Sequence, residues 1–296
     1  MPDRGDPAAM NSTLLVIGLG YSGTAVALAA ARAGFAVGGT SRRPAPPGIT
    51  GLGFEHAGPA LARATHLLVT AAPDEAGDPA LARQGAAIAA APALRWIGYC
   101  STTGVYGDRN GAWVDEGTAP APGADRARRR LAAEQAWRDL AASKGCALDL
   151  IRLAGIYGPG RSVLDDVRAG TARRIVKPGH AFGRIHRDDI AGGILAAMAQ
   201  GRPPGTRVLN FADNEPAESA AVVAYAAALL GRKPPPAVPF AEAVATMSPM
   251  ARSFWAENRK VASAATQAAL GRRWRYPSYR EGLAAILAEE RGERPA

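Results

Sequence analysis

The chain has 296 residues, of which 48% are hydrophobic and 21% charged, and its formal net charge is +9 at pH 7. No uninterrupted apolar stretch approaches the roughly 18 residues of a membrane span, and two cysteines are too few for a disulfide framework or a metal cluster. The composition predicts a folded, soluble, cytoplasmic protein with one large domain or a domain with an appended lobe.

Residues 1–11 are predicted to form a flexible polar extension. They carry three charged side chains and lack the apolar core of a secretion signal. The first strand is predicted near residues 14–18, where the apolar run is continuous, and the first helix near residues 22–33, which are rich in alanine. This order, a buried strand followed by a helix, is how a nucleotide-binding α/β domain begins.

The glycines between this strand and helix have the spacing G-x-G-x-x-G. Gly18 permits a tight turn, Gly20 lets the backbone approach a pyrophosphate, and Gly23 lets the helix pack closely on the strand. The helix N-terminus offers free N–H groups and a positive dipole end to phosphates. The alternative is a plain strand–helix turn. We predict a dinucleotide site that comprises Gly18, Leu19, Gly20, Tyr21, Ser22 and Gly23.

The second predicted strand, residues 35–40, ends at Ser41, Arg42 and Arg43. An NAD-selective site would have an acidic residue here to hold the ribose 2′-hydroxyl. Two guanidinium groups beside a hydroxyl suit the 2′-phosphate of NADP instead, because arginine binds phosphate with paired, charge-assisted hydrogen bonds. The alternative is two solvated arginines before a proline-rich loop. NADP (NADPH) is therefore the predicted cofactor.

Strand-like and helical segments continue to alternate as far as residue 153. We expect strands near 66–71, 95–100 and 148–153, a short strand at 51–55, and helices near 79–91 and 126–143. This alternation predicts an α/β fold, a Rossmann-like doubly wound parallel sheet covered on both faces, with a smaller C-terminal α/β substrate lobe. Small residues at the end of the 66–71 strand, where a cofactor could approach, add Thr70, Ala71 and Ala72 to the predicted cofactor site; ordinary turn packing is the alternative.

The sequence becomes less regular after residue 155. Helices are predicted near 188–199, 216–230, 240–247, 258–269 and 278–290, with Asp188 and Asp189 as the N-cap and first-turn acid of the first of them. We therefore expect an NADP-binding Rossmann domain over residues 12–160. Residues 161–296 are expected to form mainly the substrate-binding lobe, with some segments that return to the Rossmann domain.

Several segments carry longer motifs in a fixed order. Residues 100–107 (C-S-T-T-G-V-Y-G), 151–161 (I-R-L-A-G-I-Y-G-P-G-R) and 184–191 (R-I-H-R-D-D-I-A) are followed by a V-L-N-F strand at 208–211 and a tail at 279–283. Together they resemble the extended short-chain dehydrogenases/reductases, the epimerase/dehydratase group that acts largely on nucleotide sugars. The resemblance runs from about residue 13 to 290.

The catalytic pair of that family is missing. Its Y-x-x-x-K motif would place Arg126 in the tyrosine position and Arg130 in the lysine position, and no tyrosine lies between Tyr106 and Tyr157. Arg126 is permanently protonated and is a poor proton shuttle, whereas Arg130 could still hydrogen-bond the nicotinamide ribose. This pattern is similar to the atypical members of the family. The hypothesis is that Thr102 binds the reacting oxygen and that Tyr106, or a tyrosine of the lobe, replaces the missing acid/base; the alternative is that Tyr106 only packs in the core.

The resemblance also implies roles for residues of the later motifs. It places Tyr157 against the cofactor and Thr103, Arg161, Arg184 and His186 in segments that face the substrate. Cationic groups would suit a phosphate or carboxylate there. His186 has an alternative role as a structural hydrogen-bonding group within its motif.

The resulting prediction is an NADP-dependent oxidoreductase or epimerase-like enzyme that acts on a small, sugar-type or anionic substrate. The alternative is a catalytically silent NADP-binding sensor or assembly protein. The basic residues, even at 126–130 and 272–275, lack interleaved aromatic side chains, so nucleic acid is not a predicted partner. The four histidines lack metal-ligand spacing, so no metal is predicted. A monomer or homodimer is expected, because the arginines on the 126–143 helix disfavour the usual paired face.

Overall fold

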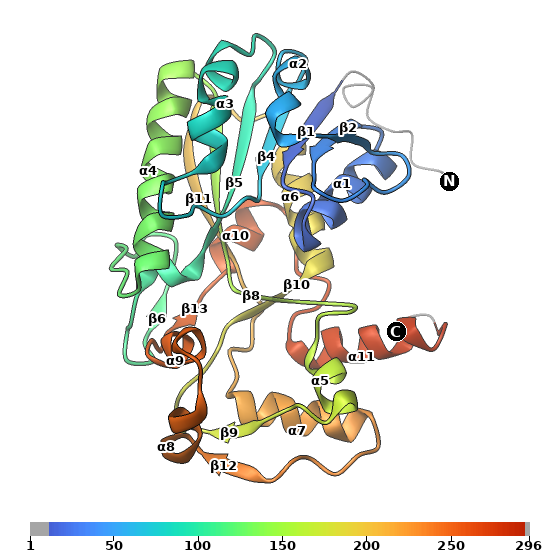
Figure 1. Cartoon of the computed structure of the whole chain (residues 1–296), viewed down its shortest axis with the longest axis vertical. Coiled ribbons are helices and arrows are strands. Elements are labelled where there is room, and N and C mark those ends of the chain that lie inside the picture. The colour runs from blue at the N-terminus through green and yellow to red at the C-terminus, as the bar shows by residue number, and fades with distance from the viewer. Residues whose placement is uncertain (1–11, 294–296) are drawn as a thin grey trace.

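The computed structural model describes residues 12–293, so the predicted extension 1–11 lies outside the described part. Within it, a parallel sheet of seven strands has the order β11-β7-β5-β4-β1-β2-β3 (Figure 1). This confirms the predicted doubly wound sheet, in which the strand order reverses between β1 and β4. The strands are β1 (Thr13–Ile17), β2 (Ala36–Thr40), β3 (Thr50–Leu52), β4 (His66–Val69), β5 (Trp96–Thr102), β7 (Ala147–Leu153) and β11 (Gly205–Phe211).

Both faces of the sheet are buried, and β1 shows why its sequence is continuously apolar. Leu14 and Val16 belong to the core on one face, and Leu15 and Ile17 to the core on the other, because successive side chains of a strand point in opposite directions. The first face is covered by α1 (Tyr21–Arg32) and α6 (Arg187–Ala199), and the second by α2 (Gly58–Leu61), α3 (Pro79–Ala90) and α4 (Asp125–Lys144).

The lobe lies below the sheet in Figure 1. From the lobe the chain returns to the sheet twice, as α6, which covers one face, and as β11, a strand at the edge. One small core joins α5, α7 and α11, and another lies beneath α8 and α9. The helices of the lobe are α5 (Val163–Ala169), α7 (Ser219–Leu229), α8 (Phe240–Ala243), α9 (Pro249–Trp255), α10 (Ala264–Ala269) and α11 (Tyr279–Glu290). Two parallel pairs lie within the lobe: β8 (Gly155–Tyr157) with β10 (Arg184–His186), and β9 (Arg174–Val176) with β12 (Ala237–Pro239). A third parallel pair joins β13 (Lys260–Val261) of the lobe to β6 (Trp113–Val114) in the loop after β5.

The structure corrects several predicted elements. The helix expected at 258–269 starts only at Ala264, because Lys260 and Val261 pair with β6 as β13. The segment 249–255, for which no element was predicted, is α9. The strand expected at 51–55 ends at Leu52, and a 3-10 turn, η2 (Phe54–His56), follows it. The N-cap of α6 is His186 rather than Asp188.

The two cysteines, Cys100 and Cys146, are buried and free. No helix within residues 12–293 is both long and apolar enough to cross a membrane.

Candidate functional site

A cavity of about 740 Å³ opens at the carboxyl end of the sheet, where it meets the lobe. This volume is in the range of small-molecule and cofactor sites, and the location is where open α/β sheets bind ligands. Its walls come from the glycine loop, the end of β5, the start of α4, the β8–β10 pair and the segment around α9. Of the predicted site residues, the cavity is lined by Gly20, Tyr21, Ser22, Gly23, Thr70, Ala72, Thr102, Thr103, Arg130, Tyr157, Arg161 and Arg184.

The glycine loop has the geometry that its spacing predicts. Gly18 has a φ of +106°, its N–H donates to Thr40 Oγ1 at 3.0 Å, and its carbonyl accepts from the Thr70 hydroxyl at 2.5 Å. A Cβ on Gly23 would overlap the carbonyl oxygen of Gly18, so only glycine permits this approach of helix to strand. A Cβ on Gly20 would have no neighbour within 4 Å and would project into open space. The loop therefore offers an open cradle at the N-terminus of α1.

Ser41, Arg42 and Arg43 lie directly after β2, beside this loop. The Leu19 N–H donates to Thr40 O at 2.8 Å, and the Ser41 hydroxyl accepts from the Arg43 N–H at 3.0 Å. Both arginine side chains are exposed and stand outside the wall of the cavity. Their contact with a 2′-phosphate stays a prediction. Leu19 and Ala71 are not among the residues that line the cavity, and their contact with the cofactor also stays a prediction.

Tyr21 ties the glycine loop to the segment after β8. Its hydroxyl donates to Pro159 O at 3.0 Å, and the guanidinium groups of Arg161 and Arg187 lie over its ring, at 5.6 and 5.3 Å from the ring centroid. These contacts place two positive charges beside the open cradle. They hold the segment after β8 against the glycine-loop end of the cavity.

Arg130, which is predicted to stand in the position of the family lysine, is anchored to the sheet. Its Nη1 donates to the carbonyls of Ala71 and Cys100, at 3.3 and 2.9 Å, and to the Tyr99 hydroxyl at 3.1 Å. The ring of Tyr99 is buried and stacks on Trp137. Arg130 is thus a fixed positive charge at the adjacent ends of β4 and β5, in the wall of the cavity.

Behind this wall lies a buried ion pair. The Arg152 guanidinium donates to Glu134 at 2.7 Å, and the Ser101 hydroxyl donates to the same carboxylate at 2.5 Å. The side chains of Arg152 and Glu134 are 3% and 1% exposed, so the pair is almost fully desolvated. It joins α4 to β5 and β7 and so positions the strand end from which Thr102 and Thr103 enter the cavity.

Thr102 faces the cavity, whereas Tyr106 does not. Thr102 Oγ1 accepts from the Gly104 N–H at 3.1 Å and caps the short helix η3 (Thr103–Tyr106). Tyr106 is completely buried, and its hydroxyl donates to Asn210 Oδ1 at 2.7 Å. Burial raises the pKa of Tyr106. The proposal that Tyr106 exchanges the proton is therefore corrected: its hydroxyl is engaged on the far side of the wall, as the packing alternative predicts.

His186, predicted to bind substrate, is also corrected. Its Nδ1 accepts from the Asp188 N–H at 3.1 Å, and its ring is packed edge-on between Tyr157 and Tyr276. The ring is 1% exposed, and burial lowers its pKa to about 4. Tyr157 lines the cavity, but its hydroxyl donates to Ser278 O at 3.3 Å and packs against α11.

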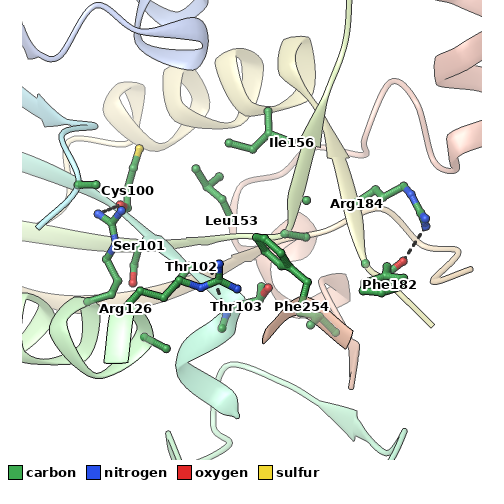
Figure 2. A pocket seen from close by; sticks show the side chains of 18 of the residues that line it. Cys100, Ser101, Thr102, Thr103, Arg126, Leu153, Ile156, Phe182, Arg184 and Phe254 are labelled. Carbon is green, nitrogen blue, oxygen red and sulfur yellow. Dashed lines mark hydrogen bonds between the residues drawn. The ribbon is translucent and has the colours of Figure 1, made fainter. Parts of the chain in front are cut away.

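Arg184 lines the cavity at the lobe side. Its Nη1 donates to the carbonyl of Phe182 at 2.8 Å (Figure 2) and to that of Ala217 at 3.2 Å. Behind it is Asp213, a buried carboxyl whose side-chain oxygens have no hydrogen-bond partner among the described residues. Burial raises the pKa of Asp213 to about 8, and the neighbouring Arg184 charge opposes this rise.

Sequence reasoning missed the part of the cavity wall that comes from the segment around α9. The Phe254 ring lies under the Arg126 guanidinium, with Cζ 3.8 Å from the ring centroid (Figure 2). Glu257 and Arg259 form an ion pair at 2.7 Å, and Arg259 also donates to Gly107 O at 2.8 Å. No motif marks these residues, because they reach the cavity from a segment more than 120 positions after α4 begins.

No family model matches the chain. Over 152 residues, 49% of its length, it is 31% identical to the 3-diazoavenalumate denitrifying reductase of a Streptomyces species. The match covers 48% of that protein, so the chain spans about half the length of the curated relatives it matches.

Solved structures match over nearly the whole chain. A conserved protein of unknown function from Silicibacter pomeroyi is 46% identical, with a TM-score of 0.85 over 94% of this chain and 99% of that one. A protein from Methylobacillus flagellatus, assigned as an NAD-dependent epimerase/dehydratase, is 27% identical, with a TM-score of 0.73 over 95% and 99%. The human epimerase family protein SDR39U1 with NADPH, 22% identical over 93% and 98%, shares the fold with a TM-score of 0.70.

Proposed function

The chain belongs to the epimerase/dehydratase group of short-chain dehydrogenases/reductases, as an atypical member, and on that premise we propose that it is an NADPH-dependent oxidoreductase. Its substrate would be a small sugar-type or anionic compound that interconverts between a hydroxyl and a carbonyl form. The observation that carries this proposal is the single cavity that joins the glycine loop to Thr102 and Arg130 at the end of β5.

The residues present fit a dinucleotide. The open space over Gly20 accommodates a diphosphate, and the first N–H groups of α1 have no partner within their own helix. Ser41, Arg42 and Arg43 would hold the 2′-phosphate, and no carboxylate stands among them to favour NAD. When bound, the nicotinamide supplies or accepts the hydride, which is chemistry the side chains cannot provide.

At the other end of the cavity the protein positions and polarises the substrate. The hydroxyl of Thr102, fixed by the Gly104 N–H, would hydrogen-bond the reacting oxygen. The Arg130 charge, fixed on two strand ends, would stabilise negative charge that develops on that oxygen without any rearrangement. Arginine stays protonated in proteins, so neither Arg126 nor Arg130 takes the proton.

The first experiment compares NADPH and NADH binding by nicotinamide fluorescence in the wild type and in the double variant Arg42→Ala/Arg43→Ala. Each hydrogen bond to a charged group contributes about 1.5–3 kcal/mol to binding. The double variant should therefore bind NADPH at least about 10-fold more weakly, with NADH binding unchanged. Arg32→Ala, which removes an exposed arginine at the end of α1, is the control and should bind both as the wild type does.

A second stage follows nicotinamide fluorescence with glyceraldehyde, pyruvate and glucuronate. Consumption of NADPH with one of these compounds supports the oxidoreductase. Equal binding of NADPH by the wild type and the double variant would contradict the cofactor assignment. Tight NADPH binding without consumption in any reaction would contradict the activity.

A further inference from the structure

Arginines of α4 that are close in sequence have very different surroundings. Arg128 pairs with Asp125 at the surface, and Arg130 is engaged on the carbonyls of the strand ends. Arg126 lines the cavity, and no acidic side chain or hydrogen-bond acceptor within residues 12–293 contacts its guanidinium. Its donors are therefore free to bind a ligand in the cavity.

Phe254 of α9 lies against the Arg126 guanidinium. A cation 3.8 Å from a ring centroid is attracted by the face of the ring, and a guanidinium held there keeps its N–H groups available for other partners. Arg126, Phe254, Thr102 and Thr103 all line the cavity and are labelled in Figure 2. The contact thus holds unpaired N–H donors in the same cavity as the residue that would hold the reacting oxygen. Phe254 is 53% exposed, so its ring adds little to the hydrophobic core.

The charge of the wall favours an anion at this position. Five arginines line the cavity against one carboxylate, Glu257, which pairs with Arg259 through Oε2 while its Oε1 has no hydrogen-bond partner among the described residues. Arg161 lies at the glycine-loop end, and Arg184 is engaged on two carbonyls. Arg126 is thus the positive side chain at the Thr102 end with neither an acid nor a carbonyl as partner.

We propose that Arg126, held over the ring of Phe254, is the receptor for an oxyanion of the substrate, a carboxylate or a phosphate. In this chain the position of the family tyrosine thus selects the substrate instead of exchanging a proton. Both oxyanions fit, because each accepts two parallel N–H bonds from a guanidinium fork. This inference rests on the proposed function for the identity of the neighbouring cofactor site.

The test measures anion binding rather than turnover. Malate and glycerol phosphate are titrated calorimetrically into the full chain, with and without saturating NADPH. Arg126→Gln should weaken binding of the preferred anion by about 10-fold or more, which corresponds to losing a hydrogen bond to a charged group. Arg128→Gln, the matched change on the same helix, should stay within about twofold, because its side chain is outside the cavity. NADPH affinity and melting temperature should be the same in all variants.

A double-mutant cycle with Phe254→Ala tests the stacking. Phe254→Ala should weaken the same anion several-fold, and the double variant R126Q/F254A should bind no worse than R126Q, since the ring acts through the guanidinium. A preference for malate identifies a carboxylate, and a preference for glycerol phosphate a phosphate. Wild-type affinity in R126Q, or no binding of either anion by the wild type, overturns the proposal. Failure of NADPH alone to bind contradicts the proposed function and leaves the anion titration without cofactor to decide the role of Arg126.

Discussion

Two glycines of the same loop should respond in opposite ways to the same added methyl group. In Gly20→Ala the new Cβ has no neighbour within 4 Å, and the residue has φ −82° and ψ −161°, which alanine adopts without strain. In Gly23→Ala the new Cβ overlaps the carbonyl oxygen of Gly18. Gly20→Ala should therefore keep the fold and lose the nucleotide, and Gly23→Ala should lose stability.

The size of each effect follows from these distances. Real Cβ atoms stay at least 3.0 Å from such an oxygen, so the start of α1 must shift in Gly23→Ala, and overpacking of this kind costs about 1–3 kcal/mol. For a domain of this size that lowers the melting temperature by roughly 2–4 °C per kcal/mol. In Gly20→Ala only the N-cap preference changes, by about 1 kcal/mol at most. Its methyl group, however, occupies the space that the diphosphate needs.

Thermal unfolding and NADPH fluorescence titration, carried out on both variants and the wild type, separate the two effects. The expected result for Gly20→Ala is a melting temperature within a few degrees of wild type and NADPH binding weaker by at least about 10-fold, because a steric block removes the close backbone contacts to the phosphates. Wild-type NADPH affinity in Gly20→Ala would refute the placement of the diphosphate over this loop, whatever Gly23→Ala does.

Two further predictions concern stability. Glu134→Gln leaves the Arg152 charge buried without an ionic partner, so it should lower the free energy of unfolding in urea by about 3–5 kcal/mol. The control Glu55→Gln, in the exposed Arg83–Glu55 pair, should lower it by at most about 1 kcal/mol. Equal losses would contradict the argument from burial. Burial lowers the pKa of His66 from 6.5 to about 4, so between these values the unfolded chain binds more protons, and up to roughly 3 kcal/mol of stability present above pH 6.5 is lost as the pH falls to 4. His66→Phe should flatten the melting-temperature profile in that window, and an unchanged slope would assign the acid loss to other groups.

The sheet and the cofactor loop could be predicted because short-range patterns decide them. A continuous apolar run such as residues 14–18 can be buried only on both faces, and the glycine spacing leaves one local conformation for the loop. The order of alternating elements then determines a parallel sheet. Thr102 is predicted instead from the family motif at residues 100–107, and it lies at the end of β5 in the wall of the cavity.

The direction of individual side chains could not be predicted in this way. Tyr106 follows Thr102 by four residues, yet its hydroxyl meets Asn210, which is over 100 positions away. His186 is a residue type that often binds substrates, but its ring caps the N-terminus of α6. Phe254 reaches the cavity from α9, a segment for which no element was predicted. Each outcome depends on tertiary contacts between distant segments, which no local pattern encodes.

The two arginines at the predicted positions of the catalytic pair have definite places in the architecture, and this argues against simple decay of an active site. Arg130 is surrounded by three acceptors from two strands, and Arg126 lies on a ring from α9. In the proposed reaction, α4 would supply positive charge where the family has its tyrosine and lysine, and arginine is a poor proton shuttle. A proton exchanged with the substrate would then pass through another part of the wall or through water.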